Sequence, residues 1–512
     1  MKFRKITYAL LVIAALGSCT KLEQRLRSEV SAESSSVTAA GLLQSAYETM
    51  NTPYQDQATL WALNEHTTDE CVGPTRAGDW DDNGVWRVLH AHTWAPDHGF
   101  AAGTFNQLLQ TQFAASSVLT KSPTAQQAAE ARFIRALSMF SVLDVWDQVP
   151  YRASLVDLKQ LPETKKGQTG ADFIISELEA IINDLPNGTP TTAIKANKNA
   201  ARALLMKLYL NRGVYANRQA PTFAAADMAK VITYADQITG YSLTSNFYKN
   251  FGPDNEAVST ENIYSLENTP GVRGGNVRSR WFCTLHYNQN PSGWNGFTTL
   301  SDFYNKFGAT DRRRGDTYTG VTDVSGLRVG FLIGQQYNQN GVALKDRGGN
   351  PLAFTPEVAL VENGGNLEVT GIRVIKFPPD YVTGSDQKAN DMVLLRYADV
   401  MLMKAEALIR SGGSNATALD LVNQVRRRGH GVPVAVPNVL VDLTGTLTLD
   451  QIIDERGREF YWEGWRRNDL IRFGKWLAAW QLKSASDPKR LLFPIPSDQL
   501  ALNPNLTQNP GY

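Results

Sequence analysis

The sequence predicts a mainly α-helical fold, in which a helical-repeat scaffold (an α/α superhelix) carries a loop-rich insertion with short strands. Three observations indicate this fold. Apolar residues recur at three- and four-residue spacing in the first and the last part of the chain. Short connectors join neighbouring helical segments. Between the two helical parts, residues 241–390 are rich in Gly, Asn and Thr and contain only short alternating runs.

The first helical pattern begins at about residue 39, after the candidate cap Thr38. A second helix is expected from Gly99 onward, with Phe100 and Phe105 packed inward. The clearest helix of the first half covers 124–146, and we expect it to stop near Pro150, since proline does not continue a helix. A further helix is expected to start at Ala171 or Asp172 and to end before Pro186.

Two later segments, 197–213 and 223–240, each finish on a glycine. Gly213 and Gly240 are predicted to end these helices, because glycine adopts the left-handed backbone of a helix end at low cost. Small residues stand where the two helices would cross. The pair is similar to a tetratricopeptide unit, which favours helical-repeat packing.

The C-terminal part has a second helical block. Residues 390–413 are apolar on nearly all sides and predict one long buried helix that ends at Gly412. The next segment, 415–430, has Asn415 as its candidate cap and is expected to pair with that helix. Residues 448–476 predict one or two more helices.

The first residues predict a lipoprotein signal peptide, 1–18. A basic start, "MKFRK", precedes an apolar run that is too short to span a bilayer. The run ends in "LGSC", which resembles the bacterial lipobox, in which the cysteine (here Cys19) is acylated and becomes the first mature residue. Residues 19–38 are polar and Ser-rich and predict a lipid-anchored flexible spacer. The alternative is an ordinary signal peptide that happens to contain a cysteine.

The charge balance favours a neutral ligand. The chain has 51 Lys+Arg against 50 Asp+Glu, a net charge of +1, so we expect no nucleic-acid partner. The basic runs "RRRGH" and "DRRRGD" are short and more typical of pairing with acids or of a protein contact. Nucleotide-binding glycine loops, "GxSxG" and "HExxH" are absent from the sequence, and we expect no cofactor.

Histidines and cysteines give weak signals for a metal site. His90 and His92 are two residues apart and would converge only on a strand, and His98 is separated from them by a proline. We therefore expect no metal site. Cys71 and Cys283 lack metal-ligand spacing, and two buried free thiols are favoured over a disulfide.

Two groups of acids invite a catalytic interpretation. Asp79, Asp81 and Asp82 in "DWDD" are candidates for a glycosidase carboxylate pair, for calcium ligands or for a solvated turn. Glu455 and Glu459 lie among basic residues at helical spacing, which favours a structural ion-pair network over a catalytic acid.

Aromatic residues gather in two loop stretches, 69–98 and 280–297, beside Asp, Asn and Arg. Flat sugar faces stack on indole and phenol rings, and short polar groups bond the hydroxyls. A single Trp is more often core or a loop anchor. Two such stretches together nevertheless favour a sugar-holding surface.

Four motifs resemble the SusD/RagB family of Bacteroidetes outer-membrane lipoproteins: "EARFIRALSMFSVLDVWDQVPY", "LLRYADVMLMKAEAL", "ERGREFYWEGWRRNDLIRFGKW" and "LFPIPSDQLALNPNLTQNPGY". They occur in order along essentially the whole chain. The resemblance implies a tetratricopeptide-like scaffold and a non-catalytic, glycan-binding protein on the cell surface. It also implies a partner, a TonB-dependent (SusC-like) outer-membrane transporter that imports the captured glycan.

The resemblance also implies the organisation of the chain and its site. The expected segments are a signal peptide (1–18), an anchor and spacer (19–38), an N-terminal helical region with a glycan-binding loop at 65–98 (39–240), the insertion (241–390) and a C-terminal helical region with the tail (391–512). Position matching gives six ligand-binding candidates, and Trp80 is added as a seventh from the same loop. The six are Asp69, Arg76, Trp94, Asp97, Tyr287 and Trp294.

Among these candidates, Asp97 stands where the family would have an amide, and Trp80 has loop anchoring as its alternative role. Two other functions stay open. One is a surface glycoside hydrolase that uses carboxylates such as Asp79 and Asp97, and the other is a transporter partner that captures peptides.

Overall fold

The computed structural model describes residues 37–272 and 274–512. The predicted signal peptide, Cys19 and most of the predicted spacer lie outside these residues. Residues 39–512 form one compact unit. The boundaries expected within this unit, at about 240 and 390, stay predictions.

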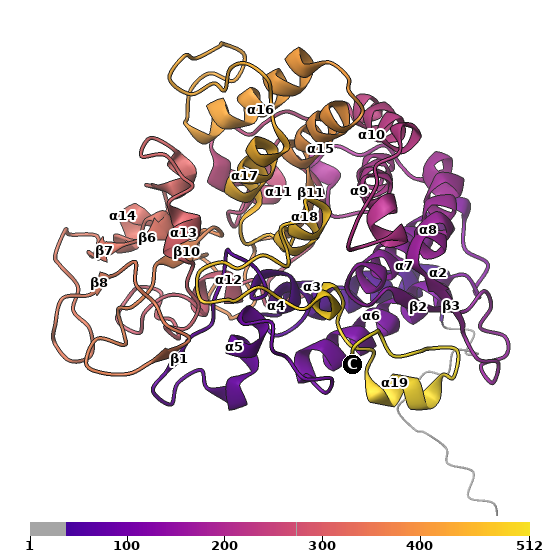
Figure 1. Cartoon of the computed structure of the whole chain (residues 1–512), viewed down its shortest axis with the longest axis horizontal. Coiled ribbons are helices and arrows are strands. Elements are labelled where there is room, and N and C mark those ends of the chain that lie inside the picture. Colours follow the sequence, from indigo (N-terminus) through magenta and orange to yellow (C-terminus); the bar gives the residue numbers. More distant parts are fainter. Residues whose placement is uncertain (1–36, 273) are drawn as a thin grey trace, which may run out of the picture. The chain divides into compact units, whose positions relative to one another are not determined.

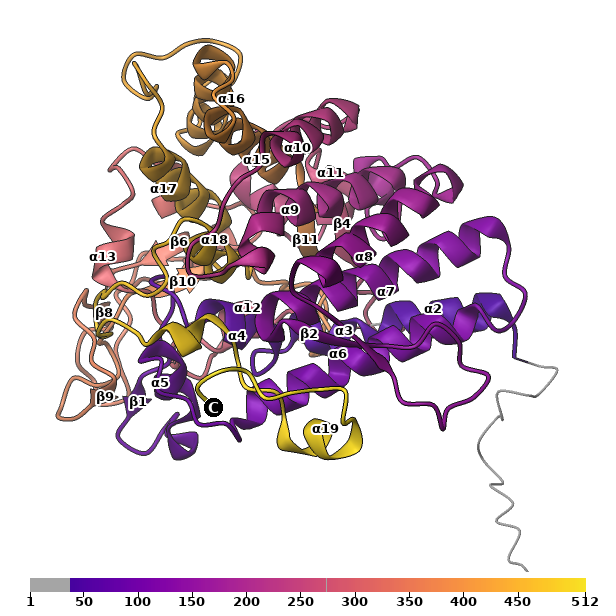
Figure 2. The ribbon, with the colours of Figure 1, turned by 45° about the vertical axis from the view of Figure 1, so that its right-hand side comes forward.

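Helices that pack against their sequence neighbours build the first half of this unit, as predicted (Figure 1). α6 packs on α7, α8 on α9, and α9 on α10. Figure 2 shows these helices side by side as a layered stack. The long helices are α2 (Ala39–Thr49), α6 (Gly99–Val118), α7 (Ala125–Trp146), α8 (Gly167–Ile181), α9 (Lys198–Ala216) and α10 (Ala225–Gln237).

Helix α7 shows how local sequence sets the helix ends. Thr124 forms a capping box with Gln127, which satisfies free amide groups of the first turn. The helix stops because Asp147 takes a left-handed backbone, φ 66°. Pro150 comes three residues later, inside strand β2 (Gln148–Tyr151). The end near Pro150 was therefore predicted correctly, but Asp147 causes it.

Three predicted helix boundaries in this half need correction. α8 begins at Gly167, directly after strand β3 (Glu163–Lys166), and not at Ala171 or Asp172. α9 runs past Gly213 to Ala216. A Cβ at Gly213 would lie 1.7 Å from the carbonyl oxygen of Thr222, so this glycine permits a close backbone approach and does not end the helix. α10 ends at Gln237, three residues before Gly240.

The C-terminal block holds four helices and one strand that was predicted as helix. Residues 392–396 form strand β11, which pairs with β4, and the helix starts only at Tyr397. Ser414, and not Asn415, caps the next helix by accepting the amide N–H of Thr417. The helices are α15 (Tyr397–Arg410), α16 (Asn415–Gly429), α17 (Leu449–Phe460) and α18 (Arg466–Arg472).

The insertion contains the predicted loops and short strands, and in addition several one-turn helices that were not predicted (Figure 1). Its three-stranded sheet has the order β10-β6-β5, and the other sheets formed by the described residues have two strands each. The remaining strands are β1 (Thr75–Arg76), β4 (Asn262–Leu266), β5 (Gly315–Asp316), β6 (Val329–Leu332), β7 (Gly334–Gln335), β8 (Ala353–Phe354), β9 (Val361–Glu362), β10 (Arg373–Ile375) and β11 (Met392–Arg396).

One hydrophobic core extends from α2 to the C-terminal tail, and a smaller one lies between α15, α16 and α17. Phe105 is fully buried and Phe100 packs on the core, as expected for α6. Among the described residues, none of the helices is both long and apolar enough to cross a membrane. The shorter helices include α3 (Asn51–Gln55), α4 (Leu60–Glu65), α5 (Val85–His90), α12 (Ser279–Phe282) and α19 (Ser497–Leu502).

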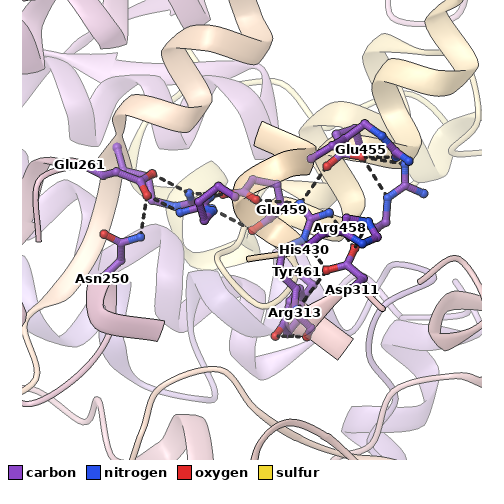
Figure 3. Close-up of polar contacts among 12 residues, drawn as sticks. Asn250, Glu261, Asp311, Arg313, His430, Glu455, Arg458, Glu459 and Tyr461 are labelled. Atoms are coloured by element: carbon purple, nitrogen blue, oxygen red, sulfur yellow. Dashed lines mark hydrogen bonds and ion pairs between the residues drawn. The ribbon is translucent and has the colours of Figure 1, made fainter. Parts of the chain in front are cut away.

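Glu455 and Glu459 belong to a buried ion-pair network, as predicted (Figure 3). The Arg313 guanidinium donates to Glu455 Oε1 and to Glu459 Oε2, each at 2.8 Å. Arg396 pairs with Glu459 at 2.5 Å, and Arg428 joins Glu459 to Glu261. Burial opposes ionisation of Glu455 and Glu459, but the arginines outweigh it and lower the pKa of both carboxyls. The network ties the insertion to the C-terminal helices.

Candidate ligand-binding groove

An open groove of about 460 Å³ lies where the loop around β1 meets the insertion. Two segments far apart in sequence, 79–86 and 287–294, form most of its wall, and Gln57 and Arg347 complete it. We call this site the aromatic groove. Its lining residues are Gln57, Asp79, Trp80, Asp82, Trp86, Tyr287, Trp294 and Arg347.

The loop before α5 is a tight turn with a strained backbone. The amide of Arg76 donates to the carbonyl of Asp79 at 2.8 Å, and the reverse bond is 3.0 Å, so the chain reverses between them. Trp80 then adopts φ 59°, and Asp82 and Asn83 also have positive φ. A bulky residue in this region costs on the order of 1–3 kcal/mol, which surrounding contacts must offset.

Contacts with the second segment hold Trp80 in place. The indole N–H of Trp80 donates to the carbonyl of Trp294 at 2.9 Å, and the two ring centroids lie 6.0 Å apart. The indole also covers Gly296, where a Cβ would lie only 2.3 Å from it. Phe297 also packs on the Trp80 ring, at 4.7 Å between centroids. Trp80 therefore anchors the loop and also lines the groove.

Tyr287 connects the two walls through its hydroxyl. It donates to Asp79 Oδ2 at 3.0 Å. Burial and this hydrogen bond raise the pKa of Tyr287 to about 12, so the hydroxyl keeps its proton at neutral pH. The Arg347 guanidinium lies 4.0 Å from the centroid of the Tyr287 ring and donates to Glu368 at 2.5 Å. The ring is thereby fixed in orientation.

The aromatic groove offers ring surfaces and hydrogen-bond acceptors side by side. Trp294 is 45% exposed, and Trp80 and Tyr287 are partly exposed. The Asp79 and Asp82 carboxylates border these rings. Rings fixed by hydrogen bonds lose little conformational entropy when a ligand packs on them. The site is suited to a ligand with flat apolar faces and hydroxyl groups.

Three of the seven predicted ligand-binding residues meet in this groove. Trp80 comes from the first predicted stretch, and Tyr287 and Trp294 come from the second, more than 200 positions later. Their role in binding a ligand stays a prediction.

Trp94 is a wrong prediction. It is only 1% exposed, because its ring stacks on Phe493 at 4.3 Å between centroids and an 11° angle. Its indole N–H donates to the Tyr512 hydroxyl at 2.9 Å, and Arg490 lies over the ring. Trp94 therefore holds the C-terminal tail and presents no face to a sugar.

The three polar candidates also lie outside the groove lining. Asp69 accepts two bonds of 2.7 Å from Arg466, whose charge outweighs burial and lowers the pKa of Asp69. Arg76 is buried and donates to the Thr370 carbonyl at 2.9 Å, so it fixes a loop of the insertion. Asp97 is exposed, but its turn does not line the groove. Asp69 and Arg76 are corrections to the predicted site, because each is paired within the protein, whereas the role of Asp97 stays a prediction.

The histidines that were weighed as metal ligands bond to the protein itself. His90 faces the carbonyls of Cys71 and Gln481, each at 3.0 Å. His92 faces Ser486 and a backbone carbonyl, and His98 faces another. Residues 37–272 and 274–512 contain no cluster of three potential metal-ligating side chains. Cys71 and Cys283 are free and buried, as expected.

Five further lining residues were not among the predicted ligand-binding residues. Asp79 and Asp82 were noticed as acids, and Trp86 as an aromatic in the same loop. Trp86 forms the floor, with its indole N–H on Asp82 at 2.8 Å. Gln57 and Arg347 carry no signal in the sequence, because only the folded chain brings them to the groove.

Comparisons with known proteins agree with this architecture. The SusD family model matches residues 234–485. The starch-binding protein SusD of Bacteroides thetaiotaomicron is 27% identical, over 89% of this chain and 85% of that protein. Surface glycan-binding protein A of Bacteroides uniformis shares the fold, with a TM-score of 0.68 at 17% identity, over 92% of this chain and 98% of that one.

The fold is also shared with surface glycan-binding protein A of Bacteroides thetaiotaomicron, solved in complex with laminarihexaose. Its TM-score is 0.67 at 16% identity, over 92% of this chain and 98% of that one. The chain is therefore similar to the SusD/RagB family in its matched residues and in its fold.

Proposed function

We propose that this protein is a lipid-anchored, cell-surface glycan-binding protein, which captures a glycan and delivers it to a TonB-dependent outer-membrane transporter. One observation carries the binding step. Trp80, Tyr287 and Trp294, from two distant stretches, line one open groove beside the Asp79 and Asp82 carboxylates. Two similar proteins support a carbohydrate ligand, since their names refer to starch and to laminarihexaose.

Capture without hydrolysis is the mechanism that we propose. Sugar rings stack on the fixed aromatic faces, and the carboxylates accept hydroxyl hydrogen bonds, which are strengthened by the charge. The hydrolase alternative used Asp79 with Asp97, but Asp97 does not line the groove. That pair therefore lacks the shared cleft that two catalytic carboxylates require.

A glycan panel tests binding against hydrolysis. Purified residues 20–512 would be run in native gels that contain starch, laminarin, levan or xylan, with casein peptides as a competitor. Retardation by at least one polysaccharide, without new reducing ends in solution, is expected. Reducing ends that accumulate would establish the hydrolase. If the casein peptides abolished the retardation by every polysaccharide, peptide capture would be favoured.

A matched pair of variants locates the site. Trp294→Ala removes an exposed ring of the groove. It should lower the affinity for the retained polysaccharide by about tenfold or more. Phe113→Ala removes a ring of similar exposure, 47% against 45%, from α6 outside the groove and should change nothing. Equal effects of the two variants would refute the proposed site.

Anchoring and delivery have their own tests. Cys19→Ala should move the protein out of the membrane fraction, because acylation would need that thiol. Full-length protein in detergent-solubilised outer membranes should co-purify with a TonB-dependent transporter. A monomer that leaves the membrane without its partner under mild detergent would count against delivery.

A further inference from the structure

Two carboxylates of the aromatic groove form no direct ion pair among the described residues, and Arg347 attracts Asp79 only from a longer distance. Asp79 accepts only the Tyr287 hydroxyl, at 3.0 Å, and Asp82 accepts only the Trp86 indole N–H, at 2.8 Å. The adjacent Asp81 differs, since it pairs with Arg87 at 2.6 Å. Both carboxylates are exposed and border the groove opening.

The cation on the groove wall is already neutralised. Arg347 donates through Nε to Glu368 Oε1 at 2.5 Å, and its amide donates to Oε2 at 3.2 Å. His286 faces the same carboxylate at 3.0 Å, and burial lowers the pKa of this histidine, so it adds no positive charge at pH 7. The charge of Arg347 is therefore offset by Glu368, and Asp79 and Asp82 leave the groove with a formal negative charge.

We infer that the aromatic groove selects uncharged glycans and excludes anionic ones, with Asp79 and Asp82 as the specificity-determining residues. This inference rests on the proposed glycan binding. A neutral sugar donates its hydroxyls to the carboxylates, whereas a uronate, sulfate or carboxymethyl group brings a negative charge next to two others. Repulsion between the anionic group and the neighbouring carboxylates, near a surface of reduced dielectric, weakens binding by about tenfold. Salt screens this repulsion.

Matched polysaccharide derivatives separate charge from bulk. Starch, laminarin and levan would each be used with a carboxymethyl and a hydroxyethyl derivative of equal substitution. Residues 20–512 should bind the hydroxyethyl form about tenfold more tightly than the carboxymethyl form in 20 mM NaCl. The ratio should shrink in 0.5 M NaCl, where the screening length falls to about 4 Å.

Two double variants test whether Asp79 and Asp82 cause the preference for the uncharged derivative. Asp79→Asn with Asp82→Asn keeps an acceptor at both positions, and it should reduce the hydroxyethyl-to-carboxymethyl ratio to about one to three. Asp157→Asn with Asp184→Asn removes the same charge from two exposed sites outside the groove and should leave the ratio unchanged.

Each outcome has a separate meaning. Equal binding of the two derivatives by the wild type overturns the inference and leaves the proposed function standing. A full ratio retained in the groove variant, or lost in the remote one, also overturns it. Absence of binding to every neutral polysaccharide refutes the proposed function itself.

Discussion

The buried network around Glu459 and the aromatic groove use the same kinds of residue for different purposes. In the network, the Glu455 and Glu459 carboxylates are fully buried and each meets at least two arginines. In the groove, Asp79 and Asp82 are exposed and meet only a phenol and an indole.

The difference lies in burial and pairing. A charge removed from water must be compensated inside the protein, whereas an exposed charge stays available to a ligand. Acid-rich motifs therefore indicate recognition only when the structure leaves the acids uncompensated. The largest effects on folding should come from the network, and the largest effects on binding from the groove.

Glu459→Ala should cause the largest loss in the free energy of unfolding. It leaves Arg313, Arg396 and Arg428 without their shared partner, which typically costs about 3–5 kcal/mol. Asp79→Ala should change stability by less than about 1 kcal/mol. Urea denaturation of both variants measures this contrast, and similar losses would contradict it.

Trp94→Ala tests the corrected role of that residue. Removal of a fully buried ring stacked on Phe493 should cost about 3–5 kcal/mol. The folded protein should keep its affinity for the glycan, because Trp94 lies outside the groove lining. Calorimetry on the folded fraction provides the measurement, and an affinity loss at full stability would restore the original prediction.

The pH dependence of stability should reveal a third arrangement, an acid pair that is buried without full compensation. Burial raises the pKa of Glu65 to about 7, and burial with repulsion from Glu65 also raises that of Glu70. The folded protein holds protons that the unfolded chain releases near pH 4.5. The stabilisation from these protons is fully present below pH 4.5 and is lost as the pH rises through 7. The free energy of unfolding should therefore fall by about 2–3 kcal/mol between pH 5 and 8.

A single variant checks the pair. Glu70→Gln removes one titrating group and supplies an amide donor to Glu65, so the decline in the urea midpoint between pH 5 and 8 should become smaller. An unchanged pH slope would show that the pair does not control it.

The smallest effect is expected at the Tyr287 hydroxyl. Tyr287→Phe keeps the ring beneath Arg347 but removes the donor to Asp79. Affinity should fall only about threefold, with stability changed by less than about 0.5 kcal/mol. Isothermal titration with the retained glycan distinguishes this from a tenfold loss, which would make the hydroxyl a principal contact.

Periodicity predicted the scaffold well because packing of amphipathic helices depends on local spacing. The helical spacing of 124–146 and the glycine-rich insertion could be seen directly in the sequence. The boundary errors had tertiary causes. Gly213 serves contact with Thr222, and 392–396 joins a strand that lies 130 positions earlier.

The site was predicted in part, for a related reason. Aromatic density identified both stretches that form the groove, but density does not separate an exposed Trp294 from a buried Trp94. That difference depends on Phe493 and Tyr512, which reach Trp94 only in the folded chain. Arg347 was missed for the same reason.

A crystal structure of residues 20–512 with an oligosaccharide from the most strongly retained polysaccharide tests the central claim most directly. The account predicts sugar rings packed on Trp80, Tyr287 and Trp294, with hydroxyls bonded to Asp79 or Asp82. A sugar bound elsewhere, with these side chains free, would contradict it.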